Sequence, residues 1–246
     1  MTMQAALNTL LTPEQKERLA KAVRVRTSCR AFQGDITLQQ RAELAYHAGR
    51  FALPGARLTL TSLPENAFTN ITGCRMAAAV LVEGEGWLNR LNAGAIGEAF
   101  VLEATAMGLG TCWVGGSFRR EAARGIAAPG ETLLALIAVG PPVTPLTAPA
   151  TRSRMAPDYL CRGNWRQWPE AYIRAATLVQ QAPSGMNQQP WALLTTEAGD
   201  FAVEAQPGSA LDAGIAILHA ELALDAPHAW RFPDTAGVLR AVAEAR

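Results

Sequence analysis

Two arginines and a serine stand at alternate positions early in the chain, as Arg26, Ser28 and Arg30. In an extended segment, alternate side chains point to the same face. Two guanidinium groups and a hydroxyl on one face can hold a phosphate, because arginine supplies forked donors and a permanent positive charge. A solvated basic turn would show the same spacing, so this segment alone leaves both interpretations open.

A denser candidate is the segment 182–191, Ala-Pro-Ser-Gly-Met-Asn-Gln-Gln-Pro-Trp. Its two prolines restrict the backbone, and Gly185 permits an unusual backbone angle. The three consecutive amide side chains at 187–189 can each donate and accept hydrogen bonds. Such groups fit the edge of a heterocycle with alternating carbonyl and N–H groups, such as the pyrimidine ring of a flavin. The alternative is an ordinary polar loop before a strand.

A third candidate is the segment 108–116, Gly-Leu-Gly-Thr-Cys-Trp-Val-Gly-Gly. Paired glycines allow the backbone to approach a ligand closely, with N–H groups free to point at it. A helix end followed by a tight turn would explain the same glycines.

The composition narrows the classes of protein that these segments could serve. The chain has 246 residues, of which 49% are hydrophobic and 17% charged, with a net charge of +1. This is a globular composition, and the near-neutral charge argues against a nucleic-acid-binding protein. The apolar runs are far shorter than the roughly 20 residues that span a bilayer. No signal peptide is apparent, and four scattered cysteines favour a reducing, cytoplasmic setting.

Other reaction classes lack their motifs. The four cysteines and three histidines form no Cys-x-x-Cys or His-Glu-x-x-His pattern, so no metal site is predicted. No Gly-x-Ser-x-Gly elbow supports a serine hydrolase. Gly84-Glu85-Gly86 lacks the third glycine of a dinucleotide-binding fingerprint.

Several elements must position the candidate segments. Capping boxes at 12–15 and 37–40 predict helices that run to about Val23 and Ala48. The segments 93–107 and 211–224 are apolar on nearly every side, which predicts two buried helices. Further helices are predicted over 118–128, 169–181 and from about Thr235, and strands over 57–61, 76–82, 132–139, 191–196 and 201–205.

The two apolar segments share a faint repeat. Asn92-Ala93-Gly94 and Asp212-Ala213-Gly214 lie 120 positions apart, and the order helix, strand, buried helix recurs around them. The stretch that separates the two parts is rich in proline, threonine and basic residues at its start. We therefore expect a first half at 1–142, a linker at 143–168 and a second, reduced half at 169–246, folded as one compact unit.

Together, the three candidate segments resemble the nitroreductase family of FMN-dependent oxidoreductases. The resemblance lies in Arg-x-Ser-x-Arg, in Gly-Leu-Gly-Thr-Cys-Trp-Val-Gly-Gly after a buried helix, and in Ala-Pro-Ser-Gly-x-Asn-x-Gln-Pro-Trp. The order is unusual, because the proline–serine loop of ordinary members precedes the Gly-Leu-Gly segment. Here that place holds residues 51–57, which lack the serine and the amides, while the second part has Ala-Pro-His-Ala-Trp at 226–230 where a Gly-Leu-Gly segment is expected. Each half thus keeps what the other lost.

The resemblance implies the single-chain branch of the family, in which two fused halves imitate the homodimer. The expected fold is α+β, an α/β/α sandwich with a central, mostly antiparallel sheet. One complete FMN site per chain and a monomer are expected. The implied activity is oxidation of NADH or NADPH and reduction of a nitroaromatic, quinone or flavin in a ping-pong cycle. No side chain is expected to act as a general acid, since the cofactor carries the chemistry.

By the same resemblance, Arg26 and Ser28 would hold the FMN phosphate, and Arg30 would lie near the ribityl chain and the flavin N1/O2 edge. A cation there favours the anionic reduced flavin. Arg152 or Arg154 matches the place where the family often supplies another phosphate-binding cation.

The flavin ring would be held by residues of the other two segments. Pro183, Ser184 and Gly185 would pack against the isoalloxazine, and Asn187 would bond its pyrimidine edge or the ribityl chain. The backbone at Val114, Gly115 and Gly116 would approach the N5/O4 side.

Two rival functions remain open at this level. One is a flavin-binding or sequestering protein without turnover, since the loss of one site shows that this lineage tolerates decay. The other is a structural α+β protein that binds no ligand.

Overall fold

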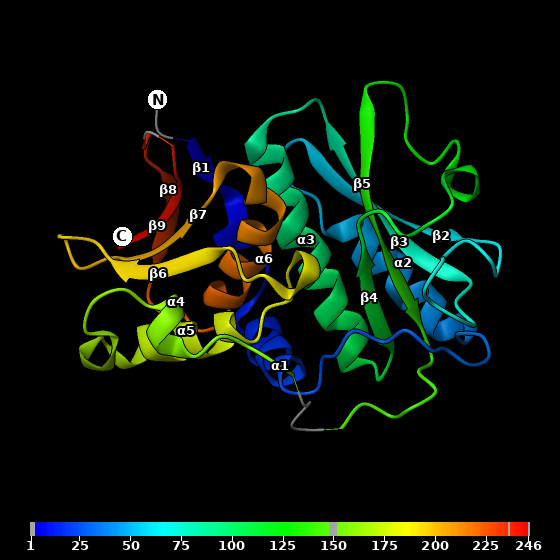
Figure 1. Cartoon of the computed structure of the whole chain (residues 1–246), viewed down its shortest axis with the longest axis horizontal. Coiled ribbons are helices and arrows are strands. Elements are labelled where there is room, and N and C mark those ends of the chain that lie inside the picture. The colour runs from blue at the N-terminus through cyan, green and yellow to red at the C-terminus, as the bar shows by residue number, and fades with distance from the viewer. Residues whose placement is uncertain (1–2, 148–151, 236, 246) are drawn as a thin grey trace.

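Two long helices, α3 (Trp87–Ala106) and α6 (Ala210–Glu221), lie side by side at the centre of the molecule, between two antiparallel sheets (Figure 1). This computed structural model describes residues 3–147, 152–235 and 237–245. One apolar core runs through both helices and reaches both sheets. A helix that is apolar on every side needs cover on every side, and here each helix receives it from its own sheet and from the other helix.

The first sheet has the strand order β2-β3-β5-β4, with every neighbouring pair antiparallel. The elements of this part, in chain order, are α1 (Pro13–Val23), α2 (Leu38–Arg50), β2 (Ala56–Ser62), β3 (Met76–Glu83), α3, β4 (Gly110–Val114), the 3-10 helix Arg120–Ala123 and β5 (Glu131–Gly140).

The second sheet has the order β1-β8-β9-β7-β6, again antiparallel throughout. Its edge strand β1 (Met3–Ala5) comes from the start of the chain and is followed by the 3-10 turn Ala6–Thr9. The other elements are α4 (Pro157–Leu160), α5 (Glu170–Gln180), β6 (Trp191–Thr195), β7 (Phe201–Ala205), α6, β8 (His228–Phe232) and β9 (Leu239–Ala245), with 3-10 turns at Trp165–Gln167, Gly185–Asn187 and Pro207–Ser209.

The chain follows the same path in both parts. In each, a helix leads into two paired strands, then a buried helix, then two more strands. The strand orders also correspond, since β2, β3, β5 and β4 occupy the places that β6, β7, β9 and β8 occupy in the other sheet. The strand β1 is an addition, placed at the outer edge of β8.

The two central helices touch through their backbones at two glycines. A Cβ atom on Gly94 would lie 2.0 Å from the Leu211 carbonyl oxygen, and one on Gly214 would lie 1.9 Å from the Leu91 oxygen. No side chain fits at either position, because real Cβ contacts are much longer. The contact is reciprocal at the 120-residue offset found in the sequence, since Gly94 corresponds to Gly214 and Leu91 to Leu211.

Most of the predicted elements are confirmed. Both capping boxes form, with Thr12 accepting from the Gln15 backbone at 3.3 Å and Thr37 accepting from the Gln40 backbone at 3.1 Å. The five predicted strands match β2, β3, β5, β6 and β7, and the two apolar segments form α3 and α6.

Three predictions about the fold are wrong. There is no single central sheet among the described residues, because the fully apolar helices take the centre and the sheets lie outside them. The helix predicted over 118–128 shrinks to the 3-10 turn Arg120–Ala123. The helix predicted from Thr235 is the strand β9, which pairs with β7 and β8 on its two sides, so tertiary pairing overrides the helix preference of its alanines and glutamate. The predicted linker contains the short helix α4, and its residues 148–151 lie outside the described residues.

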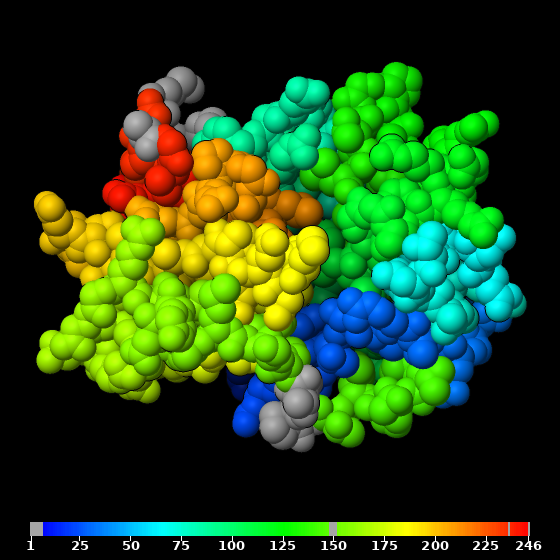
Figure 2. Space-filling view, viewed as in Figure 1, coloured from blue at the N-terminus to red at the C-terminus, as the bar shows by residue number. Residues whose placement is uncertain are grey.

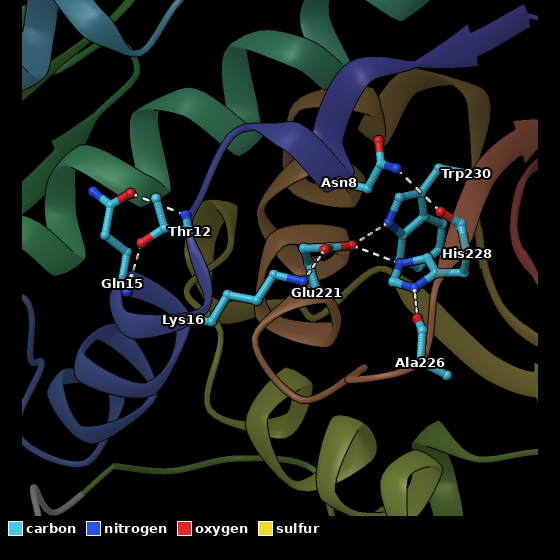
Figure 3. A network of polar contacts seen from close by, with 8 residues as sticks. All are labelled: Asn8, Thr12, Gln15, Lys16, Glu221, Ala226, His228 and Trp230. Carbon is cyan, nitrogen blue, oxygen red and sulfur yellow. Dashed lines mark hydrogen bonds and ion pairs between the residues drawn. The ribbon is translucent and has the colours of Figure 1, made fainter.

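A buried ion cluster fastens the N-terminal part of the chain to α6 and β8 (Figure 3). The carboxylate of Glu221, fully buried, accepts from Lys16 Nζ at 2.5 Å, and from Trp230 Nε1 at 2.7 Å. It also lies 2.8 Å from His228 Nε2. Burial opposes ionisation of Glu221, but its bonds to His228 and Lys16 outweigh it and lower the pKa of the carboxyl. Burial likewise opposes charge on His228, yet the bond to Glu221 raises the pKa of the imidazole.

We expect Glu221→Gln to destabilise the fold by about 3–5 kcal/mol, because removing one partner of a buried ion pair leaves the others uncompensated. Urea unfolding at neutral pH measures the change. The matched control is Glu244→Gln, which removes the half-exposed pair of Glu244 with Arg231 and is expected to cost no more than about 1 kcal/mol. Equal losses in the two variants would contradict the structural role of the cluster.

Candidate functional site

A cavity of about 640 Å³ opens where the two parts of the chain meet. The first part contributes the arginine segment, the end of β4 and the glycines after it, and the second contributes the loop before β6 and the first turns of α6. In Figure 2 the yellow loop before β6 borders the blue and green surface of the first part. Segments more than 150 positions apart in the sequence therefore share one site.

Ten of the twelve residues that the sequence singled out line this cavity. Arg26 and Arg152 are the two that do not. The ten are Ser28, Arg30, Val114, Gly115, Gly116, Arg154, Pro183, Ser184, Gly185 and Asn187.

The arginine segment is held against β4 by close packing at Gly110. A Cβ atom there would lie 2.8 Å from the side chain of Cys29, so only glycine lets the segment approach. The Cys29 N–H donates to the Thr111 carbonyl at 2.8 Å, and Ser28 forms a parallel bridge to the same residue. This pairing directs Ser28 into the cavity from the edge of β4.

Three arginines concentrate positive charge at this site. Arg26 is 2% exposed, and the Nε atoms of Arg26, Arg152 and Arg154 are buried and have no hydrogen-bond partner within residues 3–147, 152–235 and 237–245. Burial, and next the charge of Arg26, lower the pKa of both Arg152 and Arg154 to about 10. The opposing negative charge comes from Glu98, which acts on all three. Three cations against one carboxylate leave an excess of positive charge that suits an anion.

Glu98 ties the two parts together beneath the cavity. Its carboxylate, fully buried on α3, accepts from Trp113 Nε1 at 2.9 Å and lies 3.0 Å from His219 Nε2 on α6. The other ring nitrogen of His219 meets the Leu178 carbonyl at 2.9 Å. His219 is thus a core histidine with a partner at each ring nitrogen. Trp113 lines the cavity, and the hydrogen bond from its indole N–H to Glu98 holds the ring in place.

The loop before β6 carries unusual backbone geometry. Met186, Asn187 and Gln189 have φ values of 51°, 58° and 47°, in the left-handed region that side-chain-bearing residues rarely adopt. Gly185, which permits such an angle, is not among the residues with positive φ, and the unusual angles fall on its neighbours. Three such residues in one loop store strain, and strain of this kind clusters at functional sites.

The amides of this loop divide between structure and site. Gln189 is buried, accepts from the Met155 N–H at 2.7 Å and donates to the Gln180 carbonyl at 3.0 Å, so it fastens the loop. Asn187 lines the cavity, where its side chain accepts from Arg154 and donates to the Ser153 carbonyl at 3.2 Å.

The sequence reasoning missed several residues that line the cavity. The most notable is Asp212, in the first turn of α6, whose carboxylate accepts the Gly185 N–H at 2.9 Å. Its position at the repeat offset from Asn92 was the only signal available. The other missed residues are Asn70, Ser117, Ala135, Leu211 and Ile215, while Cys112, Trp113 and Met186 line the cavity from within the candidate segments.

The environment of Cys112 disfavours the thiolate form. Burial raises its pKa, although the charge of Arg30 opposes the shift. Within the ranges that the structure describes, His, Cys, Asp and Glu form no group that could hold a metal ion. In the same ranges no helix has the length and apolar character needed to cross a membrane.

A family model described as "Putative TM nitroreductase" matches residues 18–224 of the chain. The chain belongs to this nitroreductase family. Members of the nitroreductase family are generally flavin-dependent oxidoreductases, and FMN is the family cofactor. None of the curated proteins compared with the chain matches it.

A solved nitroreductase shares the fold over nearly the whole chain, and others match part of it. A "putative nitroreductase" from Thermotoga maritima is 19% identical and superposes with a TM-score of 0.62, over 92% of this chain and 93% of its own. A nitroreductase family protein from Clostridium difficile, 17% identical, covers 53% of this chain and 87% of its own, with a TM-score of 0.43. A "putative nitroreductase" from Desulfovibrio desulfuricans was crystallised with FMN; it is 18% identical and covers 56% of this chain and 91% of its own, with a TM-score of 0.44.

Proposed function

We propose that the chain is an FMN-dependent oxidoreductase that takes electrons from NADH or NADPH and passes them to a nitroaromatic, quinone or flavin. The observation that carries this proposal is the cavity, which collects the three candidate segments from both parts of the chain. Both substrates use this one cavity in turn, which corresponds to ping-pong kinetics. FMN supplies the hydride and electron chemistry when bound.

The cationic end of the cavity fits the FMN phosphate. Ser28, Arg30 and Arg154 present donors to the cavity. Arg26 and Arg152 add charge close behind the wall, since Arg26 acts on Cys112 and Arg154, which line it. The unpartnered Nε atoms support this assignment, because buried guanidinium groups without an anion are costly.

The other end of the cavity fits a flat aromatic ring. Val114, Ala135, Leu211 and Ile215 offer apolar surface there. Gly115 and Gly116 have nothing within 4 Å of an added Cβ, so their backbone is open to a ligand. Pro183, Ser184, Gly185 and Asn187 close the site from the second part of the chain.

We also propose that residues 1–142 and 169–246 are two fused halves that imitate a homodimer, joined by 143–168. The repeated order of elements and the reciprocal contacts of Gly94 and Gly214 support it, because a two-fold interface pairs residues reciprocally. On this basis the protein is a monomer that contains both of its pseudo-subunits.

The position related to the cavity by this pseudo-symmetry lacks the three candidate segments and holds a smaller cavity of about 370 Å³ beside Trp87 and Phe232. The outer edge of β4 forms a bridge with Ser28. The corresponding edge of β8 is paired with the strand β1 instead. Trp87, at the start of α3, packs edge-on against Phe232 with ring centroids 5.5 Å apart. The loop before β2 turns tightly through a bridge between Leu53 and Ala56 and carries no amides. One FMN per chain follows.

A first test is the reduction of the bound flavin. We expect stopped-flow mixing of the yellow protein with NADH or NADPH to bleach the flavin, and a nitroaromatic or quinone to restore the colour. Failure of both nucleotides to bleach it would favour the flavin-binding protein without turnover. A colourless preparation that takes up no FMN would overturn the flavin assignment itself.

Arg26→Ala should weaken FMN binding by roughly 10- to 100-fold, because the phosphate loses a buried positive charge close behind the wall, and an interaction with a charged group contributes about 1.5–3 kcal/mol. Fluorescence titration of the apoprotein with FMN measures the change. Arg41→Ala, which removes an exposed arginine on α2, is the control and should leave affinity unchanged. Wild-type affinity in the Arg26 variant would remove this residue from the site.

The flavin content should approach one FMN per chain after saturation and desalting. Flavin absorbance, compared with protein mass from amino-acid analysis, gives this ratio. A ratio of two would mean that the position occupied by β1 and Trp87 still binds cofactor.

A further inference from the structure

Asp212 is the one acidic residue among the described residues that line the cavity. It stands in the first turn of the twelve-residue helix α6, and its Oδ1 accepts the Gly185 N–H at 2.9 Å. A helix N-terminus favours a carboxylate, yet this one is half-buried and forms no ion pair with any described residue. A half-buried carboxylate held by a single backbone donor is an expensive group to keep.

The hydrogen bond of Asp212 falls where the strained loop begins. Ser184 Oγ accepts the Gln189 N–H at 2.8 Å across the loop, and Gln189 fastens its far end to Met155 and Gln180. Between these ends lie the left-handed residues Met186 and Asn187. Strained backbone persists only where surrounding contacts stabilise it, and the hydrogen bond from Gly185 to Asp212 is such a contact.

The other half offers an internal comparison at Asn92, which occupies the place of Asp212 in α3. Asn92 is buried and also contacts the proline–glycine loop of its own half, where its Nδ2 donates to the Pro54 carbonyl at 3.0 Å. An amide cannot ionise. The charged residue thus stands only on the side that has the cavity.

The charge of Asp212 shares this cavity with two cations. Arg30 and Arg154 line the same walls, and Cys112 is the remaining titratable group there. Arg154 remains positive at neutral pH, because its lowered pKa is still about 10, and burial raises the pKa of the Cys112 thiol, which disfavours its charged form. Asp212 is therefore the one group that offsets the positive charge inside the lining.

We propose that Asp212 is a positioning residue that fixes the strained loop through Gly185 and, by its negative charge, limits how strongly the cavity favours the electron-rich, reduced form of the flavin. The loop contact stands on the geometry alone. The effect on the flavin rests on the proposed function.

Burial raises the pKa of Asp212, although the Gly185 bond opposes the shift. A carboxyl whose pKa is raised in the folded state stabilises the fold only when it is protonated. For Asp212 this contribution is lost as the pH rises from the ordinary pKa of 3.8 through the raised pKa of the folded state. At neutral pH Asp212→Asn should therefore be at least as stable as the wild type. If Asp212 served only to stabilise the fold, Asp212→Asn would be less stable than the wild type.

The loop is tested in the apoprotein by hydrogen exchange of the amides of residues 185–189. Asp212→Ala should speed their exchange by about tenfold or more, because a charge-assisted bond is lost. Asp212→Asn, which keeps an oxygen acceptor, should change it less. Asn92→Ala is the matched control and should leave these amides unaffected. Wild-type exchange rates in Asp212→Ala would overturn the positioning role.

The charge is tested by the midpoint potential of the bound flavin in the full chain. Asp212→Asn should shift the potential upward by about 30 mV, which is a tenfold change in the equilibrium of a two-electron couple, and Asn92→Ala should not shift it. An unchanged or lower potential would overturn the electrostatic role. If the wild-type protein bound no FMN, the proposed function and this electrostatic role would fail together, and the exchange rates would still decide whether Asp212 holds the loop.

Discussion

The backbone contact between α3 and α6 at Gly94 and Gly214 is the constraint on which the rest of the structure depends. Each glycine meets a carbonyl of the opposite helix, so the two helices approach as closely as backbones allow. This approach sets the distance between the two sheets and brings the first turn of α6 to the end of β4. The cavity lies at that junction, and its dimensions follow from the helix crossing.

Burying both helices between sheets leaves polar groups in the core, and they are paired across the molecule. Glu98 on α3 joins Trp113 to His219, Glu221 on α6 joins Lys16 to β8, and Glu103 accepts from Arg18 at 2.8 Å. Such pairs contribute little net stability compared with apolar packing, but each has partners in one arrangement only. They therefore specify how α1, β8 and the central helices fit together.

The sequence predicted local structure well where the signal was local. Capping boxes at Thr12 and Thr37 and the all-round apolar character of α3 and α6 need no tertiary information. The short strands β4 and β8 were missed, because five residues next to glycine or proline carry too little pattern. The strand β9 was misassigned, because alanine and glutamate favour helix until neighbouring strands are present.

The three candidate segments of the site could also be recognised in the sequence, because each is a short, contiguous stretch of residues. What could not be seen was the contribution of residues outside these segments that the fold brings to the cavity, such as Asn70 and Asp212. The backbone strain fell on Met186, Asn187 and Gln189 instead of Gly185. A left-handed angle on a side-chain-bearing residue is imposed by its surroundings and leaves no mark in the sequence.

The pairing of β1 with β8 has a consequence for how the protein is made. The strand β1 completes a sheet whose other strands lie between residues 191 and 245, and Asn8 bonds to a residue 220 positions further on. During synthesis β1 therefore has no partner strand in this sheet until His228–Phe232 has emerged. Contacts of such long range form slowly. Closure of this sheet at β1 is thus a late step of folding.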